Sequence, residues 1–417
     1  MRRDCRGLRD LNCLFASKRR EGMLSSDLFR FAITLSFQQA RAKIRRNVVA
    51  FAGIAGGIVL VLVQLGFQSA LYESAVRLHR ILNGEIVVVA SEFRSIQDPT
   101  WFSREWLVMA QGHPAVASVA PLYLSPVAVR NIDDRTVRTL LGIGIELDEP
   151  ALKTERLDAD LRSLRIPGRI LFDRKSQPSY GDVIGRLQRD GTVEMTTASY
   201  SSPLQEPLTV VGSHLLGGTV VYFGTALMSA ATLTSISGQP LQRINIGVVK
   251  LKPNANAAEV AAQLQKLLPE GTLAMTLPTF VRLEKRFWSN ETPIGFLFDL
   301  GALIGFLISG IYIYQVLFQI VDENLAEYAV LKSMGYPNSF FAVLVVCTAT
   351  ILAIAAIPPA VAVSFIVYEI CVAATLLDLE LTTARVLGVG GLTILIATLS
   401  AWFAKRRLHR IDPAALM

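Results

Sequence analysis

Few side chains in this sequence could do chemistry together. Its four histidines are scattered, and no two stand at a spacing typical of metal ligands; they are His79, His113, His214 and His409. The sequence contains no G-x-x-x-x-G-K-[ST] loop, no G-x-S-x-G motif and no H-E-x-x-H motif. We therefore expect no catalytic residue, no metal and no cofactor in this chain, and no ATP held in a P-loop of its own.

Acidic side chains are frequent between residues 98 and 182, and paired carboxylates can do acid–base work. They include Asp98, Asp133, Asp134, Asp158, Asp160, Asp173 and Asp182. Nothing in the sequence fixes their separation, and basic residues are as frequent around them, so we interpret them as solvated surface charge. Residues 73–299 contain no cysteine, which excludes a disulfide-stapled domain there.

The most informative polar segment is ENLAEYAVLKSMGYPN, residues 323–338, between two apolar stretches. Glu323 and Glu327 are four residues apart and share one face of a helix. A short charged helix of this kind is what a groove in another protein would receive. The candidate site residues are Glu323, Glu327, Tyr328, Leu331, Lys332 and Gly335. The alternative is an ordinary capped connector between two helices.

Composition then defines the class of protein. Of 417 residues, 52% are hydrophobic and only 18% are charged, and the mean hydropathy is +0.42. Four uncharged stretches approach or exceed the ~20 residues that cross a bilayer: residues 47–72, 300–321, 333–368 and 386–404. Pro358 and Pro359 are expected to kink or break the third. Disordered and collagen-like classes are excluded, and a soluble enzyme is disfavoured.

Charge predicts the topology. The formal charge is +7, with the excess near the N-terminus rather than spread over a folded face, so we expect no nucleic-acid partner. Basic residues precede the first stretch and follow the last, which predicts both termini in the cytoplasm. The segment 322–337 is then cytoplasmic although it is acidic, against the positive-inside rule. Trp288 and Trp402 are expected in the interfacial aromatic belts.

These arguments divide the chain as follows. Residues 1–23 form a disordered or artefactual tail, and 24–46 an amphipathic helix lying on the membrane, capped by Ser25 or Ser26. The spans are 47–72, 296–321, 338–368 and 386–404, separated by an extracytoplasmic domain (73–295), a cytoplasmic helix (322–337) and a short outer loop (369–385). Residues 405–417 form a cytoplasmic tail. Gly301 and Gly305 favour close helix contact, which is compatible with a dimer.

The extracytoplasmic domain contains two β-α-β patterns. The first comprises a strand at 85–91, a helix at 104–111 and a strand at 116–129. The second comprises a strand at 244–252, a helix that Asn254 or Asn256 caps and that runs to Leu268, and a strand at 273–278. Together they predict a ferredoxin-like base formed by residues about 80–132 and 242–280, with a β-rich lobe inserted at about 135–240. The fold class is thus an α/β membrane protein with four transmembrane helices and a large α+β domain.

Several segments resemble a known family. The arrangement of one large external domain after the first of four helices is similar to the MacB/FtsX/LolC-type ABC permeases. Within them, residues 64–89, 168–181, 292–338 and the closing RIDPAAL resemble DevC, the permease of a cyanobacterial heterocyst glycolipid exporter. The similarity runs from about Met23 to the C-terminus and is most specific over 292–338.

The resemblance implies a multi-pass protein of the bacterial inner membrane with a periplasmic domain. It implies a homodimer driven by a separate, DevA-like ABC ATPase, which binds ATP and docks on the coupling helix at 322–337. Further implied partners are a DevB-like membrane-fusion adaptor, a TolC-like outer-membrane channel and membrane lipid. Implied cargo is lipid, glycolipid or another hydrophobic molecule. The alternatives are an FtsX-like regulator of a periplasmic cell-wall hydrolase, and a self-contained receptor.

Overall fold

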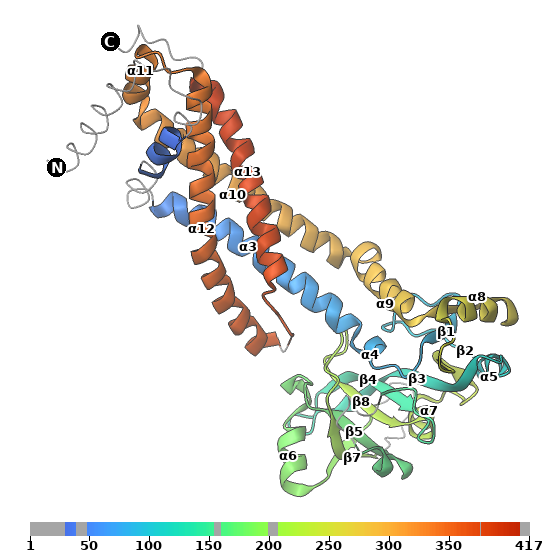
Figure 1. The fold of residues 1–417 in the computed structure, drawn as a ribbon. Helices are drawn as coiled ribbons and strands as arrows, with labels where there is room; N and C mark the ends of the chain where they lie inside the picture. The colour runs from blue at the N-terminus through green and yellow to red at the C-terminus, as the bar shows by residue number, and fades with distance from the viewer. Residues whose placement is uncertain (1–29, 39–47, 154–159, 199–206, 376, 409–417) are drawn as a thin grey trace. The chain divides into compact units, whose positions relative to one another are not determined.

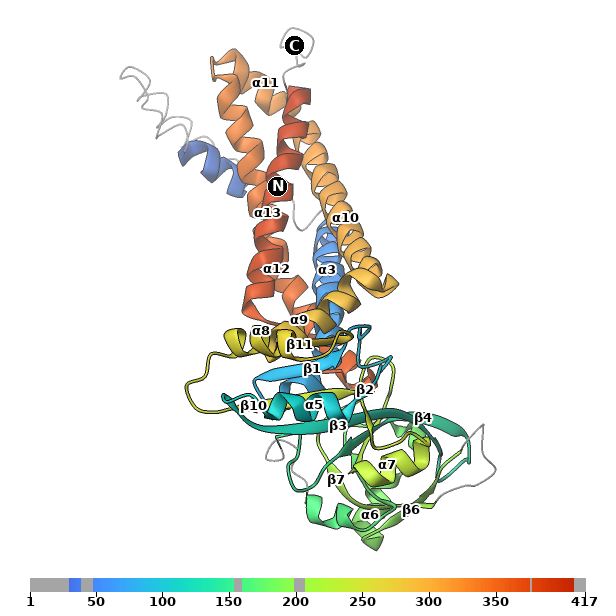
Figure 2. The ribbon, with the colours of Figure 1, turned by 90° about the vertical axis from the view of Figure 1, so that its right-hand side faces the viewer.

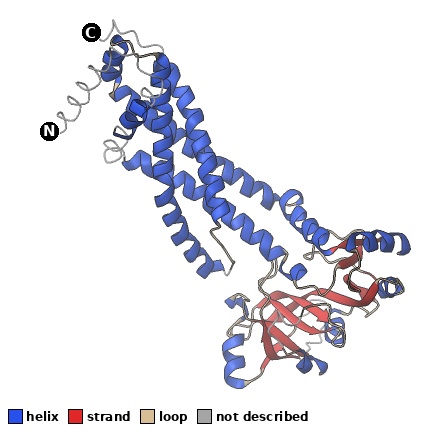
Figure 3. Cartoon of the chain, in the orientation of Figure 1, coloured by secondary structure: helices blue, strands red, loops and turns tan. Residues whose placement is uncertain are grey.

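The computed structural model describes residues 30–38, 48–153, 160–198, 207–375 and 377–408. The chain forms two compact units. The helical unit comprises Met1–Gly66, Phe298–Ile370 and Glu380–Met417, and the sheet unit comprises Phe67–Leu297 and Cys371–Leu379. The described strands all belong to the sheet unit (Figure 3). The predicted tail at 1–23, the caps Ser25 and Ser26 and the residues after Leu408 lie outside the described ranges.

Four long helices carry the apolar stretches (Figure 1): α3 (Val48–Ala75), α10 (Pro293–Glu323), α12 (Asn338–Thr375) and α13 (Thr383–Leu408). Each contains a segment long and apolar enough to cross a membrane, namely Phe51–Ala75, Pro293–Glu323, Ser339–Ala374 and Thr383–Trp402. The predicted number of spans is therefore confirmed for the described residues. Of the two predicted effects of Pro358 and Pro359, a kink or a break, the break is wrong, because α12 continues through both prolines.

Glycine residues set the contact between α3 and α10. A Cβ added at Gly57 would collide with the Ser309 side chain, and one added at Gly305 would lie 2.6 Å from Val61 Cγ2. A Cβ at Gly301 would likewise collide with Gln64. Small residues let the two helix backbones approach closely. Gly301 and Gly305, which the sequence offered to a dimer contact, therefore serve a contact within this chain.

Residues 30–38 are helical, and one face of this helix packs on α12. Ser36 Oγ donates to the Leu344 carbonyl at 3.0 Å, and Phe31 stacks on Phe340 with ring centroids 5.9 Å apart. Ile33 and Phe37 remain exposed. The sequence predicted that this helix lies on the membrane, which stays a prediction; the structure shows that one face of residues 30–38 packs on protein.

The base of the sheet unit interleaves the two β-α-β halves (Figure 2). The first half is β1 (Ile86–Ala90), α5 (Arg104–Gln111) and β3 (Val116–Arg130), and the second is β10 (Ile246–Leu251), α8 (Ala257–Leu267) and β11 (Thr272–Thr276). The strands run in the order β11-β1-β10-β3, with every neighbouring pair antiparallel. The split arrangement predicted from sequence is confirmed. Asn256, rather than Asn254, caps α8 by accepting from Ala258 N.

Each face of the base has its own apolar core. Strand β1 is fully buried, and its alternate residues point to opposite faces. Ile86 and Val88 pack with Leu107 of α5 and with α8. Val87 and Val89 pack on the other face, with α4 (Arg77–Arg80) and α9 (Leu277–Arg286). The base is therefore covered by helices on both faces.

The lobe continues the same sheet. Its elements are β4 (Val137–Ile145), β5 (Arg169–Asp173), α6 (Val183–Asp190), β6 (Val193–Thr196), β7 (Pro207–His214), β8 (Thr225–Ser229) and α7 (Ala230–Ser237). Strand β3 pairs with β10 along its first half and with β4 from Leu122 to Arg130. A nine-stranded sheet in the order β11-β1-β10-β3-β4-β8-β5-β7-β6 results. The short strands β2 (Phe102–Ser103) and β9 (Arg243–Ile244) pair separately.

Candidate functional site

The charged segment between the second and third spans forms helix α11 (Leu325–Ser333) in the helical unit. Asn324 separates it from α10, and the Asn324 side chain donates to the Ile320 carbonyl at 2.8 Å. Glu327 lies in the first turn and Lys332 in the last turn. Both positions suit the helix dipole, which favours acids at the start and bases at the end.

Gly335 ends this helix. The amide of Gly335 donates to the Lys332 carbonyl at 3.0 Å, and that of Tyr336 donates to the Leu331 carbonyl at 3.2 Å. These two bonds are those of a Schellman motif, which needs a left-handed residue at Gly335. Its φ of 89° is open to glycine at little cost. We therefore assign Gly335 a structural role in ending α11.

The six candidate residues do not share one surface. Tyr328 is only 3% exposed and meets Phe341 edge-to-face, with ring centroids 5.9 Å apart. Leu331 is half-buried against the same core, and Lys332 is half-buried. Glu323, Glu327 and Gly335 are exposed. Tyr328 thus anchors α11 to the helical unit, and Leu331 packs on the same core with only part of its side chain.

The exposed face of α11 comprises Ala326, Glu327, Val330, Ser333 and Met334. Val330 is 53% exposed and Met334 is 44% exposed. Neither was among the candidates, although both follow Glu327 at helical spacing, three and seven residues later. Exposed apolar residues beside an acid, on a helix whose opposite face is buried, make a surface that a protein groove can accept.

A second polar cluster lies inside the sheet unit, around Glu284 of α9. Glu284 Oε1 accepts from Ser95 Oγ at 2.6 Å and from Trp288 Nε1 at 2.9 Å. Its Oε2 accepts from the Ile96 amide at 3.1 Å and lies 3.5 Å from His79 Nε2. The sequence placed Trp288 in an interfacial belt, and this is wrong. Trp288 is buried because its indole N–H has a partner one helical turn away.

The remaining candidates for chemistry do not gather. Among the described residues, no group of three His, Cys, Asp or Glu side chains could hold a metal ion. His214 is buried beside Asp173 at the paired ends of β7 and β5. Burial lowers the pKa of His214, and the Asp173 carboxylate opposes that shift. Asp134 and Asp182 are exposed, and hydrogen bonds from Thr136 and from Arg189, respectively, lower their pKa values.

Comparisons with known proteins can now be set beside this geometry. Residues 300–413 match the model of the FtsX-like permease C-terminal family. The periplasmic region of MacB from Actinobacillus actinomycetemcomitans is similar at 13% identity and a TM-score of 0.32, over 48% of this chain and 92% of that one. The extracellular domain of the noncanonic ABC-type transporter YknZ from Gram-positive bacteria is similar at 15% identity and a TM-score of 0.32, over 46% and 98%.

No curated protein sequence matches the chain. The family match covers α11, most of α10, and α12 and α13, which include three of the four candidate spans. The chain therefore has four helices long and apolar enough to cross a membrane among its described residues, and its C-terminal part is similar to the FtsX-like permease C-terminal family.

Proposed function

We propose that this chain is the permease subunit of a tripartite ABC exporter in the bacterial inner membrane. A separate ATPase binds and hydrolyses ATP, and the permease transmits the resulting motion to its sheet unit and to a membrane-fusion adaptor. The adaptor leads to an outer-membrane channel, and the cargo is a lipid, a glycolipid or another hydrophobic molecule. The chain itself does no chemistry and works as a homodimer with both termini in the cytoplasm.

One observation carries this proposal: the exposed face of α11. The helix connects two spanning helices, yet it presents Val330, Met334 and Glu327 to solvent. Its other face, with Tyr328 and Leu331, is packed on α12. A force applied to the exposed face would therefore reach α12 directly. The FtsX-like match over the same residues supports an ATPase as the partner that applies it.

Co-purification of the full-length protein from gently solubilised membranes tests the proposal. Val330→Asp places a charge in the centre of the exposed face without touching the core. We expect it to lower the recovery of the ATPase about tenfold, which corresponds to ~1.4 kcal/mol. Glu327→Lys, at the edge of the same face, should lower it less. Recovery of the adaptor should stay unchanged in both variants.

The matched control is Val108→Asp on α5, because Val108 and Val330 are both 53% exposed. It should leave ATPase recovery unchanged. Wild-type recovery of the ATPase with Val330→Asp would show that the exposed face of α11 is not the docking surface. A periplasmic cell-wall hydrolase in place of the adaptor would identify the chain as an FtsX-like regulator instead.

A further inference from the structure

The sheet unit contains a cavity of about 230 Å³ that the proposed function does not use. Its lining includes Leu71 and Ser74 of α3, Phe223 of the loop between β7 and β8, and Leu377 of the segment after α12. Two cationic side chains, Arg77 and Lys175, also line it. The cavity is thus apolar on several sides and positively charged on one.

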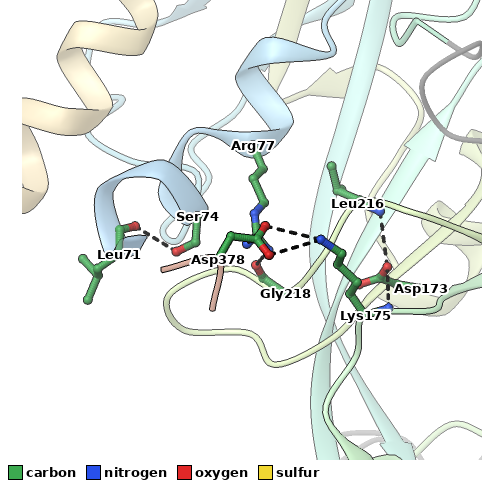
Figure 4. A network of polar contacts seen from close by, with 8 residues as sticks. All are labelled: Leu71, Ser74, Arg77, Asp173, Lys175, Leu216, Gly218 and Asp378. Carbon is green, nitrogen blue, oxygen red and sulfur yellow. Dashed lines mark hydrogen bonds and ion pairs between the residues drawn. The ribbon is translucent and has the colours of Figure 1, made fainter. Parts of the chain in front are cut away.

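A single carboxylate is shared between the two cations (Figure 4). Arg77 Nη2 lies 2.8 Å from Asp378 Oδ2, and Lys175 Nζ lies 3.3 Å from each Asp378 oxygen. Asp378 belongs to the short segment between α12 and α13 and is 53% exposed. These three side chains sum to one positive charge, so the Asp378 carboxylate leaves the cations incompletely neutralised.

The cations are held by a built framework. Asp173 Oδ1 accepts from the amides of Lys175 and Leu216, at 3.1 and 3.2 Å, and so ties the end of β5 to the loop after β7 (Figure 4). Gly217 in that loop has a φ of 89°, and a Cβ there would collide with the Arg77 guanidinium. Arg77 Nη1 also donates to the Gly218 carbonyl at 3.4 Å. The loop backbone therefore cradles the head of Arg77.

The cavity lies next to the ends of two candidate membrane spans. Leu71 and Ser74 are in the last turns of the span Phe51–Ala75, and Leu377 follows the span that ends at Ala374. The loop between β7 and β8, which lines the cavity, exposes three large apolar side chains, Leu215, Val221 and Phe223. Exposed apolar residues beside basic ones, at the end of a spanning helix, are typical of contact with lipid headgroups.

We propose that this cavity binds the phosphate of an anionic lipid headgroup, which takes the place of Asp378 on Arg77 and Lys175. Guanidinium and ammonium groups both pair with phosphate oxygens. The cavity is smaller than the ~300–1,000 Å³ that encloses a whole drug-sized ligand, so the headgroup enters and the acyl chains stay outside, against the apolar rim. Free phosphate shares the headgroup's charge but makes no contact with that rim. The site is independent of the proposed coupling to an ATPase.

Native mass spectrometry of the purified full-length protein tests this, with phosphatidylglycerol and phosphatidylcholine as probes. We expect Arg77→Gln with Lys175→Gln to lower retention of phosphatidylglycerol at least tenfold. Asp378→Asn should raise it several-fold, because the competing internal carboxylate is removed. Retention of phosphatidylcholine should not change. Millimolar inorganic phosphate should not displace the bound lipid.

The matched control is Arg189→Gln, which removes an exposed cation that pairs with Asp182 on α6, away from the cavity. It should leave retention unchanged. The single substitution Lys175→Arg, with Arg77 unchanged, keeps both positive charges and should retain the lipid. Comparing it with the double variant separates loss of binding from loss of folding. Unchanged or lower retention in Asp378→Asn would overturn the proposal. So would an equal loss in Arg189→Gln, or full displacement of the lipid by inorganic phosphate.

Discussion

At the scale of single residues, Glu284 is the side chain on which the position of α9 depends. Its two oxygens accept from three donors, and it is completely buried. Removing one partner of a buried hydrogen-bond network leaves the other groups without partners, at a cost of several kcal/mol.

We therefore expect Glu284→Ala to lower the free energy of unfolding of the sheet unit by roughly 3–5 kcal/mol. Denaturant unfolding followed by tryptophan fluorescence measures this, since three of the four tryptophans of the chain belong to the sheet unit. The control is Glu259→Ala on α8, where the carboxylate is exposed and bonds only to Asn256 among the contacts described. It should change the free energy by about 0.5 kcal/mol or less. Equal effects of the two substitutions would contradict this account.

His214 gives the sheet unit a dependence on pH. Because burial lowers its pKa in the folded state, the folded protein binds a proton on His214 less readily than the unfolded chain does. Stability is therefore complete above the unfolded pKa of about 6.5. It falls as the pH drops below that value, by at most ~1.4 kcal/mol per pH unit, and levels off below the folded pKa.

The variant His214→Gln isolates this contribution, since other groups titrate in both proteins. We expect the free energy of unfolding of the wild type to fall relative to that of the variant between pH 7 and pH 5. Asp173, Arg174 and the backbone of Thr225 in β8 lie around the imidazole ring of His214 in the wild type. Parallel pH profiles for the two proteins would show that His214 does not titrate differently on folding.

Sequence reasoning could not predict that Glu284 and His214 are buried. A glutamate in a basic, amphipathic helix such as α9 has the pattern of a surface residue, and its partners Ser95 and His79 lie about two hundred positions away. Trp288 was assigned to an interfacial belt because it directly precedes an apolar stretch, and its burial beside Glu284 follows from the tertiary packing of the sheet unit. The identity of a buried polar partner is decided by tertiary contacts, which leave no local periodicity.

At the scale of elements, the spacing of apolar residues was sufficient to predict a helix where it continued along the whole element. Helix α5 occupies Arg104–Gln111, the predicted range, because its apolar residues recur at helical spacing. The predicted shared helical face of Glu323 and Glu327 is wrong, because Glu323 ends α10, Asn324 interrupts the helix and only Glu327 belongs to α11. The local pattern did predict a short helix in this segment. It did not predict which side is buried, because Tyr328 and Val330 are both apolar enough to face a core. The contact between Tyr328 and Phe341 decides it.

Strand β3 is the element whose role the sequence concealed. The sequence predicted residues 116–129 as one strand of the base, with an inserted lobe beyond it, and β3 occupies Val116–Arg130. In the structure the strand belongs to both parts, since Leu122 pairs with Ile246 of β10 and with Ile145 of β4. Pairing partners far apart in sequence are set by register across the whole sheet. The base and the lobe therefore share a strand rather than a linker.

At the scale of the whole molecule, this shared strand makes the sheet unit a single cooperative body. One apolar core contains Val88 of β1, Val127 and Val129 of β3, and Val210 of β7. Unfolding of the lobe would expose the part of this core that also covers the base. Segments that share a continuous core open together, with similar free energies.

Hydrogen–deuterium exchange of the full-length protein checks this cooperativity. We expect the amides of β1 and β7, at distant positions in the sheet order, to open with free energies within about 1 kcal/mol of each other. Helix α6 should exchange earlier, because it contributes only part of one face to the core. If β5 and β7 exchanged rapidly while β1 and β10 stayed protected, the lobe would be an independent domain. A motion imposed on the base would then not reach it through β3, whereas cooperative opening would mean that β3 transmits such a motion across the whole sheet.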